Sequence, residues 1–297
     1  MTVRQLLVLV AGVIAISWAA PLIRLAEPAP ALTIAALRLV LSAPPMIALA
    51  ATRRARAASP LGRRDLGLLV VSAVALAAHF AFWVESVQRT SILASVVLVT
   101  MQPLFVAIGA WLFLRERPTR AVATGIALGV VGAALLVGPG AVDAGTRAGA
   151  FGGNVFALAG GVMSSVYPVI GRGARRRLST ATYGAVVYGI AAVLLVGLAL
   201  GTGTPLGGQP GTAYVFIVLL ALVPQLIGHN ALNWALGSLP AAVVAVAILG
   251  EPVGAALIAA LLLDERPTLL EGVGGAVVLA GVYVVLRGAR SQRDPPR

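Results

Sequence analysis

The stretch from residue 90 to residue 137 of this 297-residue chain has a related copy 149 residues later. On that shift Gln102-Pro103 aligns with Glu251-Pro252, and LRERPT at 114–119 aligns with LDERPT at 263–268. A period of 149 residues is too long for a solenoid, whose repeat units have about 20–50 residues. The repeat therefore predicts two related halves of one molecule.

Composition places this molecule in a membrane. The chain is 59% hydrophobic and 11% charged, whereas soluble domains are about 45–50% apolar and about 25% charged. Such a chain could not cover its apolar surface in water, so we expect a polytopic protein whose partner is the lipid bilayer. The net charge of +12 comes from 22 arginines. They lie in short clusters between apolar runs, as membrane insertion requires, and this pattern predicts no nucleic-acid partner.

About 20 apolar residues are needed to cross a bilayer as a helix. On that measure the sequence predicts an all-α integral membrane protein with ten transmembrane helices. The predicted spans are 4–22, 30–51, 66–86, 91–114, 120–138, 150–170, 181–201, 212–235, 239–263 and 269–287. They give a first five-helix repeat at 1–140, a second at 149–288, and a tail at 289–297.

The first span also has the layout of a secretory signal peptide, with Arg4 ahead of a short apolar run. However, its Ser17 and Pro21 match Ser164 and Pro168 of the sixth span. This match favours a permanent first helix over a cleaved leader.

Arginine counts set the predicted orientation. With the N-terminus inside, seventeen arginines fall on the cytoplasmic side and four outside, while Arg38 lies within a span. This positive-inside bias predicts a protein of the cytoplasmic membrane with both termini in the cytoplasm. Because each half has five spans, the second repeat would enter the membrane inverted. Inverted repeats underlie alternating access around a central site near the midplane.

Several features together resemble the EamA-like family of the drug/metabolite transporter superfamily. They are the five-plus-five arrangement, the mid-span prolines Pro103 and Pro252, the Leu-x-Glu-Arg-Pro ends, Ser17-Trp18 and Ala36-Leu37-Arg38. The resemblance implies a ten-helix bundle around a central cavity that exports amino acids or other small metabolites. Members of the family often have Glu-Pro in both halves, but the first copy here is Gln102-Pro103.

Glu251 is the first candidate for a substrate-binding or proton-coupling residue. It is thirteenth in its predicted span, where a charged side chain costs about 2.5–3.5 kcal/mol. It could equally be a structural hydrogen bond between helices. Pro103 and Pro252 cannot donate a backbone N–H, so each can kink its helix and free a carbonyl beside Gln102 or Glu251. In lipid, such a group must face protein or a wet cavity.

The two histidines of the chain, His79 and His229, occupy matching places in the third and eighth spans. Histidine titrates near neutrality and suits proton relay or carboxylate binding, although it can also be a plain interhelical donor. Trp83 and Asn233 each follow four residues after a histidine, so each pair shares a helix face.

Arg38 is the remaining charged candidate, about nine residues into the second span. Its expected partner is Glu251, with Glu85 second, unless the side chain extends to the interface as an anchor. Trp18 and Tyr167 are further candidates for the cavity, with packing as the alternative.

The sequence thus predicts a secondary transporter, an exporter of small metabolites such as amino acids, with the proton as a candidate coupling ion. It predicts no enzyme activity, no cofactor and no metal site, because no phosphate loop, His-Glu-x-x-His or Ser-His-Asp spacing occurs and there is no cysteine. A membrane scaffold and a membrane enzyme using His79, His229 and Glu251 are the alternatives. The pattern leaves a monomer or a homodimer open.

Overall fold

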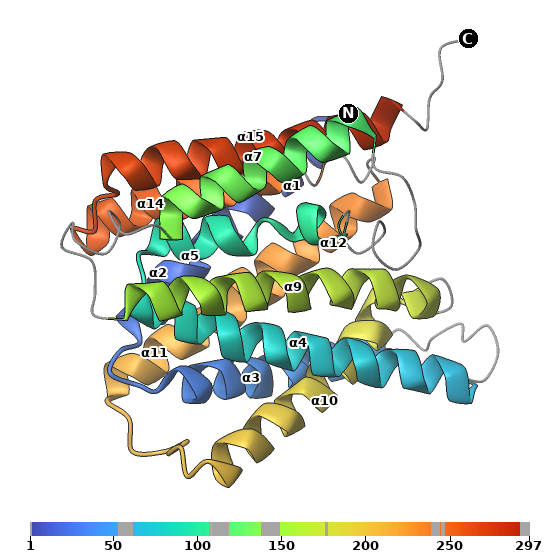
Figure 1. Cartoon of the computed structure of the whole chain (residues 1–297). Coiled ribbons are helices and arrows are strands. Elements are labelled where there is room, and N and C mark those ends of the chain that lie inside the picture. Colours follow the sequence, from blue (N-terminus) through green and yellow to red (C-terminus); the bar gives the residue numbers. More distant parts are fainter. Residues whose placement is uncertain are drawn as a thin grey trace.

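The computed structural model describes residues 2–52, 62–106, 108, 119–137, 149–175, 178–238, 244 and 247–291. These residues form a bundle of helices without a β-strand (Figure 1). In the first half the helices are α1 (Val3–Ser17), α2 (Ala19–Leu25), α3 (Ala31–Thr52), α4 (Arg63–Arg89), α5 (Ile92–Val99) and α7 (Arg120–Val137). In the second half they are α9 (Ala150–Arg175), α10 (Thr180–Gly201), α11 (Gly211–Leu220), the π-helix η1 (Ala221–Gly228), α12 (His229–Ser238), α14 (Gly250–Leu262) and α15 (Leu269–Ser291).

Five helical segments are long and apolar enough to cross a membrane. They are Val3–Leu25, Ala31–Thr52, Asp65–Arg89, Ala181–Gly201 and Gly211–Leu232. Five shorter apolar segments fall within the other predicted spans: Ile92–Val106, Arg120–Leu136, Ala150–Val166, Gly250–Leu262 and Leu269–Val285. The predicted all-helical membrane class is confirmed, and each predicted span overlaps one of these segments.

Short hydroxyl side chains fix where several helices begin. The Thr2 hydroxyl accepts a hydrogen bond from the Gln5 backbone N–H, and the Gln5 side chain accepts one from the Thr2 backbone N–H. Together these two bonds form a capping box at the start of α1. Ser91 and Ser179 cap α5 and α10 in the same way through one backbone N–H each. These bonds satisfy donors that a helix N-terminus leaves unpaired.

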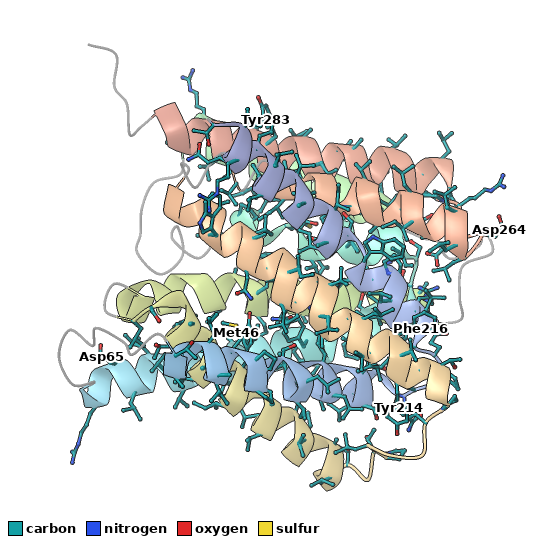
Figure 2. All side chains as sticks on the ribbon, turned by 180° about the vertical axis from the view of Figure 1, so that it is seen from behind. Met46, Asp65, Tyr214, Phe216, Asp264 and Tyr283 are labelled. Atoms are coloured by element: carbon teal, nitrogen blue, oxygen red, sulfur yellow. The ribbon has the colours of Figure 1, made fainter. Side chains whose placement is uncertain are left out.

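Large apolar side chains cover the outside of the bundle along its length, as lipid requires. Val193 is 72% exposed and Leu261 is 82% exposed. Two acidic residues, Asp65 in the first turn of α4 and Asp264 in the loop after α14, lie at opposite ends of the bundle (Figure 2). In addition, α1 begins at the end where α15 finishes (Figure 1).

Helix packing follows a two-fold pattern between the halves. The equivalent helices α3 and α10 pack on each other, and so do α7 and α15. α5 and α14, which are parts of equivalent interrupted spans, are also in contact. The contact of α4 with α9 is matched by that of α1 with η1 and α12. If a two-fold axis relates the two repeats, every contact between a helix of the first repeat and a helix of the second must have such a counterpart.

Glycines let α7 and α15 meet backbone to backbone, side by side in Figure 1. A Cβ on Gly281 would lie 2.7 Å from the carbonyl oxygen of Gly125, and a Cβ on Gly132 would lie 2.7 Å from that of Gly274. The earlier glycine of α7 thus meets the later glycine of α15, so the two helices are antiparallel. Because they are equivalent helices, the second repeat is inverted relative to the first.

Replacing Gly281 by alanine should therefore destabilise the protein. The new methyl group would meet the backbone of α7, which cannot rotate away, and we expect a loss of about 1–3 kcal/mol. Thermal unfolding of purified protein in detergent measures it. Gly272→Ala in the same helix has no atom within 4 Å of the added Cβ and should be neutral or stabilising. Equal effects of the two variants would contradict the crossing.

Candidate functional site

Two equivalent helices are interrupted at equivalent points near the middle of the bundle. In the first half α5 ends at Val99, and the helix resumes at Gln102 after Thr100 and Met101. In the second half Leu249, which aligns with Thr100 on the 149-residue shift, interrupts the helix just before α14. Each interruption lies three residues before a proline, whose missing N–H leaves a carbonyl unpaired. Polar groups are thereby brought to mid-helix in both repeats.

The polar residues beside the two prolines have different surroundings. The side-chain amide of Gln102 donates to the backbone oxygen of Ser164 at 2.6 Å, which ties the interrupted helix to α9. Glu251 is half-buried and makes no direct hydrogen bond or ion pair to any residue that the structure describes. Among the residues that the structure describes, its carboxylate is therefore not engaged as a hydrogen-bond acceptor.

Arg38 lies on α3 and is fully buried, with 0% exposure. Its Nε donates to Oε1 of Gln225 at 2.9 Å. Within the described part of the chain, Nη1 and Nη2 have no hydrogen-bond partner. The interfacial position that the sequence left open for Arg38 does not occur, because the guanidinium points into the bundle.

Aromatic rings from α4 form one wall around this guanidinium. Its central carbon lies 4.2 Å from the ring centre of Phe80 and 5.7 Å from that of Trp83. Aromatic faces attract such a cation, more strongly where water is excluded. Trp83 also stacks on His79, with ring centres 5.8 Å apart. The predicted shared face of His79 and Trp83 is thus present.

The two histidines and the acidic candidate lie around the same centre. His79, His229, Glu251 and Tyr188 are all within electrostatic range of Arg38. The Nδ1 of His79 contacts the backbone oxygen of Gly160 at 2.9 Å. We call the set Arg38, His79, Phe80, Trp83, Tyr188, Gln225, His229 and Glu251 the central cluster.

Several predicted residues lie elsewhere or could not be placed. Glu85, the second expected partner of Arg38, instead pairs with Arg89 at the end of α4. Trp18 is half-buried at the junction of α1 and α2. The side chains of Tyr167 and Asn233 lie outside the described residues.

The direct partner of Arg38 was not anticipated from the sequence. Gln225 lies in the π-helix η1, one residue after Pro224, and it is also close to the Tyr188 side chain. The sequence did contain a signal for Gln225, because a proline next to a polar residue occurs there inside an apolar run. Gln102-Pro103 and Glu251-Pro252 are pairs of the same kind, with the polar residue before the proline instead of after it.

The central cluster is asymmetric even though the scaffold is repeated. On the 149-residue shift Arg38 aligns with Val187, and Glu251 aligns with Gln102. Each repeat therefore contributes one charge of opposite sign, and neither charge has a charged counterpart in the other repeat.

Comparison with known proteins identifies the family. The model of the EamA-like transporter family matches residues 4–138 and 151–287, which is most of both halves. The chain belongs to the EamA-like transporter family. The sequence resemblance is thus confirmed, and the EamA-like family assignment indicates a multi-pass membrane transporter rather than an enzyme.

Two further proteins are similar to this EamA-like chain. A protein of Archaeoglobus fulgidus named "Uncharacterized transporter" is 25% identical over 249 residues, covering 83% of this chain and 84% of its own. A solved structure titled "Crystal structure of protein" covers 99% of this chain and all of its own at 18% identity, with a TM-score of 0.66. The latter likeness shows a shared fold.

Gln225→Met should lower stability, because the buried Arg38 guanidinium would lose its hydrogen-bond acceptor. We expect a loss of about 1–3 kcal/mol in thermal unfolding. Arg38→Met in the same background should restore most of it, since a buried charge can be replaced by an apolar side chain at little cost. Gln209→Met in the loop before α11 is the control, with an expected change within about 0.5 kcal/mol. A double variant no more stable than Gln225→Met would contradict this account of the pair.

Proposed function

We propose that this protein is a secondary transporter that exports small metabolites such as amino acids across the cytoplasmic membrane by alternating access. The central cluster would be the substrate site, at the midplane between two inverted repeats. Family membership, the antiparallel crossing of α7 and α15 and the paired helix interruptions support this reading. In such carriers the binding site lies where discontinuous helices of the two repeats meet.

The observation that carries the proposal is the pair of opposite charges with unused hydrogen-bonding capacity. Among the residues described, the two Nη groups of Arg38 have no hydrogen-bond partner, and Glu251 has no direct partner. An arginine fork suits a carboxylate, and a carboxylate suits an ammonium group. A free α-amino acid has both groups on one carbon, so it complements the two charges together. The aromatic wall of Phe80 and Trp83 would exclude water from the arginine end.

Access to the two ends differs in the present conformation. Glu251, His79 and His229 are half-buried, whereas Arg38 is fully covered. A substrate would therefore reach Glu251 and the histidines first. A movement of the surrounding helices would then be needed to reach the guanidinium.

The orientation is proposed from charge. Most arginines fall on the side that would hold both termini, which the positive-inside rule assigns to the cytoplasm. Export is the usual direction in the family that the chain resembles. The proton is the proposed coupling ion because Glu251 and the two histidines are the titratable groups of the central cluster besides Tyr188 and Arg38.

Uptake by proteoliposomes tests this function. A pooled panel of labelled amino acids would be offered with and without an imposed pH gradient. We expect gradient-driven flux in the wild type and its loss in Glu251→Gln, because the amide cannot carry a proton. Glu85→Gln is the control, since this glutamate lies at the end of α4 and pairs with Arg89; its flux should be unchanged. Flux that ignores the gradient and survives Glu251→Gln would contradict proton coupling, and no flux of any solute would count against transport.

Competition experiments test the role assigned to Arg38. For a transported amino acid, we expect its carboxamide to compete about tenfold less well or worse, because it cannot accept charge-assisted bonds from the guanidinium. In Arg38→Met, binding should weaken and the acid and amide should compete equally. If wild-type protein failed to distinguish acid from amide, Arg38 would not bind the carboxylate.

A further inference from the structure

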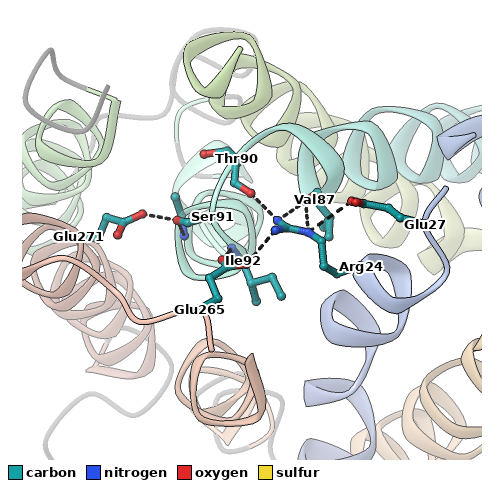
Figure 3. Close-up of polar contacts among 9 residues, drawn as sticks. Arg24, Glu27, Val87, Thr90, Ser91, Ile92, Glu265 and Glu271 are labelled. Atoms are coloured by element: carbon teal, nitrogen blue, oxygen red, sulfur yellow. Dashed lines mark hydrogen bonds and ion pairs between the residues drawn. The ribbon is translucent and has the colours of Figure 1, made fainter. Parts of the chain in front are cut away.

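A second polar network, which shares no residue with the central cluster, joins the two repeats around Arg24 (Figure 3). Its centre is Arg24 on α2, which is 7% exposed. The guanidinium donates to the backbone oxygens of Val87 and Thr90, at 2.5 Å and 2.6 Å. These carbonyls lie at the C-terminus of α4, where a helix leaves its last acceptors unpaired. Arg24 therefore ties α2 to the end of α4 within the first repeat.

The same arginine reaches across to the second repeat. Its Nη1 forms an ion pair with Oε2 of Glu265 at 2.8 Å, in the loop between α14 and α15. The other oxygen of Glu265 accepts the backbone N–H of Ile92, the first residue of α5, at 2.5 Å. One carboxylate thus binds a buried cation and the positive end of a helix at once.

Glu271 adds a second connection between the halves. Its Oε1 accepts the hydroxyl of Ser91, the residue that caps α5. Its Oε2 accepts the backbone N–H and the hydroxyl of Thr268, at 2.8 Å and 3.0 Å, in a capping box at the start of α15. Glu271 is only 3% exposed.

We propose that Arg24, Glu265, Glu271 and Ser91 form a latch that holds this end of the transporter closed. Each of its cross-links joins the first repeat to the second, so the end cannot open without breaking them. Breaking them would separate the buried Arg24 from the Glu265 carboxylate and would take their acceptors from the Ile92 N–H and the Ser91 hydroxyl, which resists opening. This inference rests on the proposed alternating access, and on the proposed orientation the latch closes the outer face.

The chain has no cysteine, so one introduced cysteine reports accessibility without background. Ser17 is suited to this, because it is 3% exposed and its side chain packs against Gly254 of the second repeat. It lies seven residues before Arg24, about 10 Å deeper along the helix. Its hydroxyl bonds only to Val13 of its own helix in the described structure, so Ser17→Cys removes no hydrogen bond between the halves.

The test is the rate at which Ser17→Cys reacts with a membrane-impermeant maleimide added outside. Adding Glu265→Gln should raise this rate about tenfold or more, equivalent to about 1.4 kcal/mol of latch stability. Arg266→Gln is the matched control, because among the described residues this neighbour forms only an exposed ion pair with Asp264; it should leave the rate unchanged. A rate in Glu265→Gln no higher than in Arg266→Gln would overturn the latch. Labelling needs no substrate, so it separates failure of the latch from failure of the proposed transport.

A covalent version of the latch covers the case in which Glu265→Gln does not fold. Ser91→Cys combined with Glu271→Cys would be bridged by a short methanethiosulfonate cross-linker. We expect bridging to slow labelling of a third cysteine at Ser17 and, in protein shown to transport, to stop flux until a reductant releases it. Unchanged labelling of the bridged protein would overturn the latch, as would full flux with the bridge in place.

Discussion

The close antiparallel contact of α7 and α15 is the interaction on which the architecture depends. At Gly125–Gly281 and Gly132–Gly274, each backbone occupies the space that a side chain would need. Lipid gives little hydrophobic driving force for helix association, so such close packing has to hold the helices together. Because the contact joins equivalent helices of the two halves, it also fixes their relative inversion. The exchanged pairs α4–α9 and α1–α12 then follow from the same two-fold relation.

The need to satisfy polar groups inside lipid explains where the chemistry lies. An interrupted helix exposes backbone carbonyls, which the membrane interior tolerates only against protein or water. The interruptions at Thr100–Met101 and Leu249 are placed in the bundle for this reason. Arg38 obeys the same rule, since it is enclosed by Gln225 and two aromatic rings. Buried polarity and helix breaks therefore gather at one depth.

Sequence reasoning recovered the parts of this structure that depend on periodicity and composition. Apolar runs gave the helical class and the spans, and the 149-residue repeat gave the two halves. The partners of individual side chains could not be predicted in this way. Arg38 was expected to pair with an acidic residue, but it donates a hydrogen bond to Gln225. That choice depends on which face of η1 turns inward, which an apolar sequence does not encode. The sequence did not predict the contacts of Arg24 either, because the partners described for it, other than Glu27, lie 63 to 241 residues away.

The unequal charges of the two repeats have a consequence for the transport cycle. If the two repeats exchanged their conformations, an inward-facing carrier would become an outward-facing one. Arg38 would nevertheless remain in the first repeat and Glu251 in the second. The two facing states would thus resemble each other in shape and differ in electrostatic environment, so a substrate would have a different dissociation constant on each side. For a carrier without a driving ion, detailed balance then requires the empty protein to favour the weaker-binding state in compensation. Asymmetry of this kind sets the concentration at which each face saturates, without setting the equilibrium gradient.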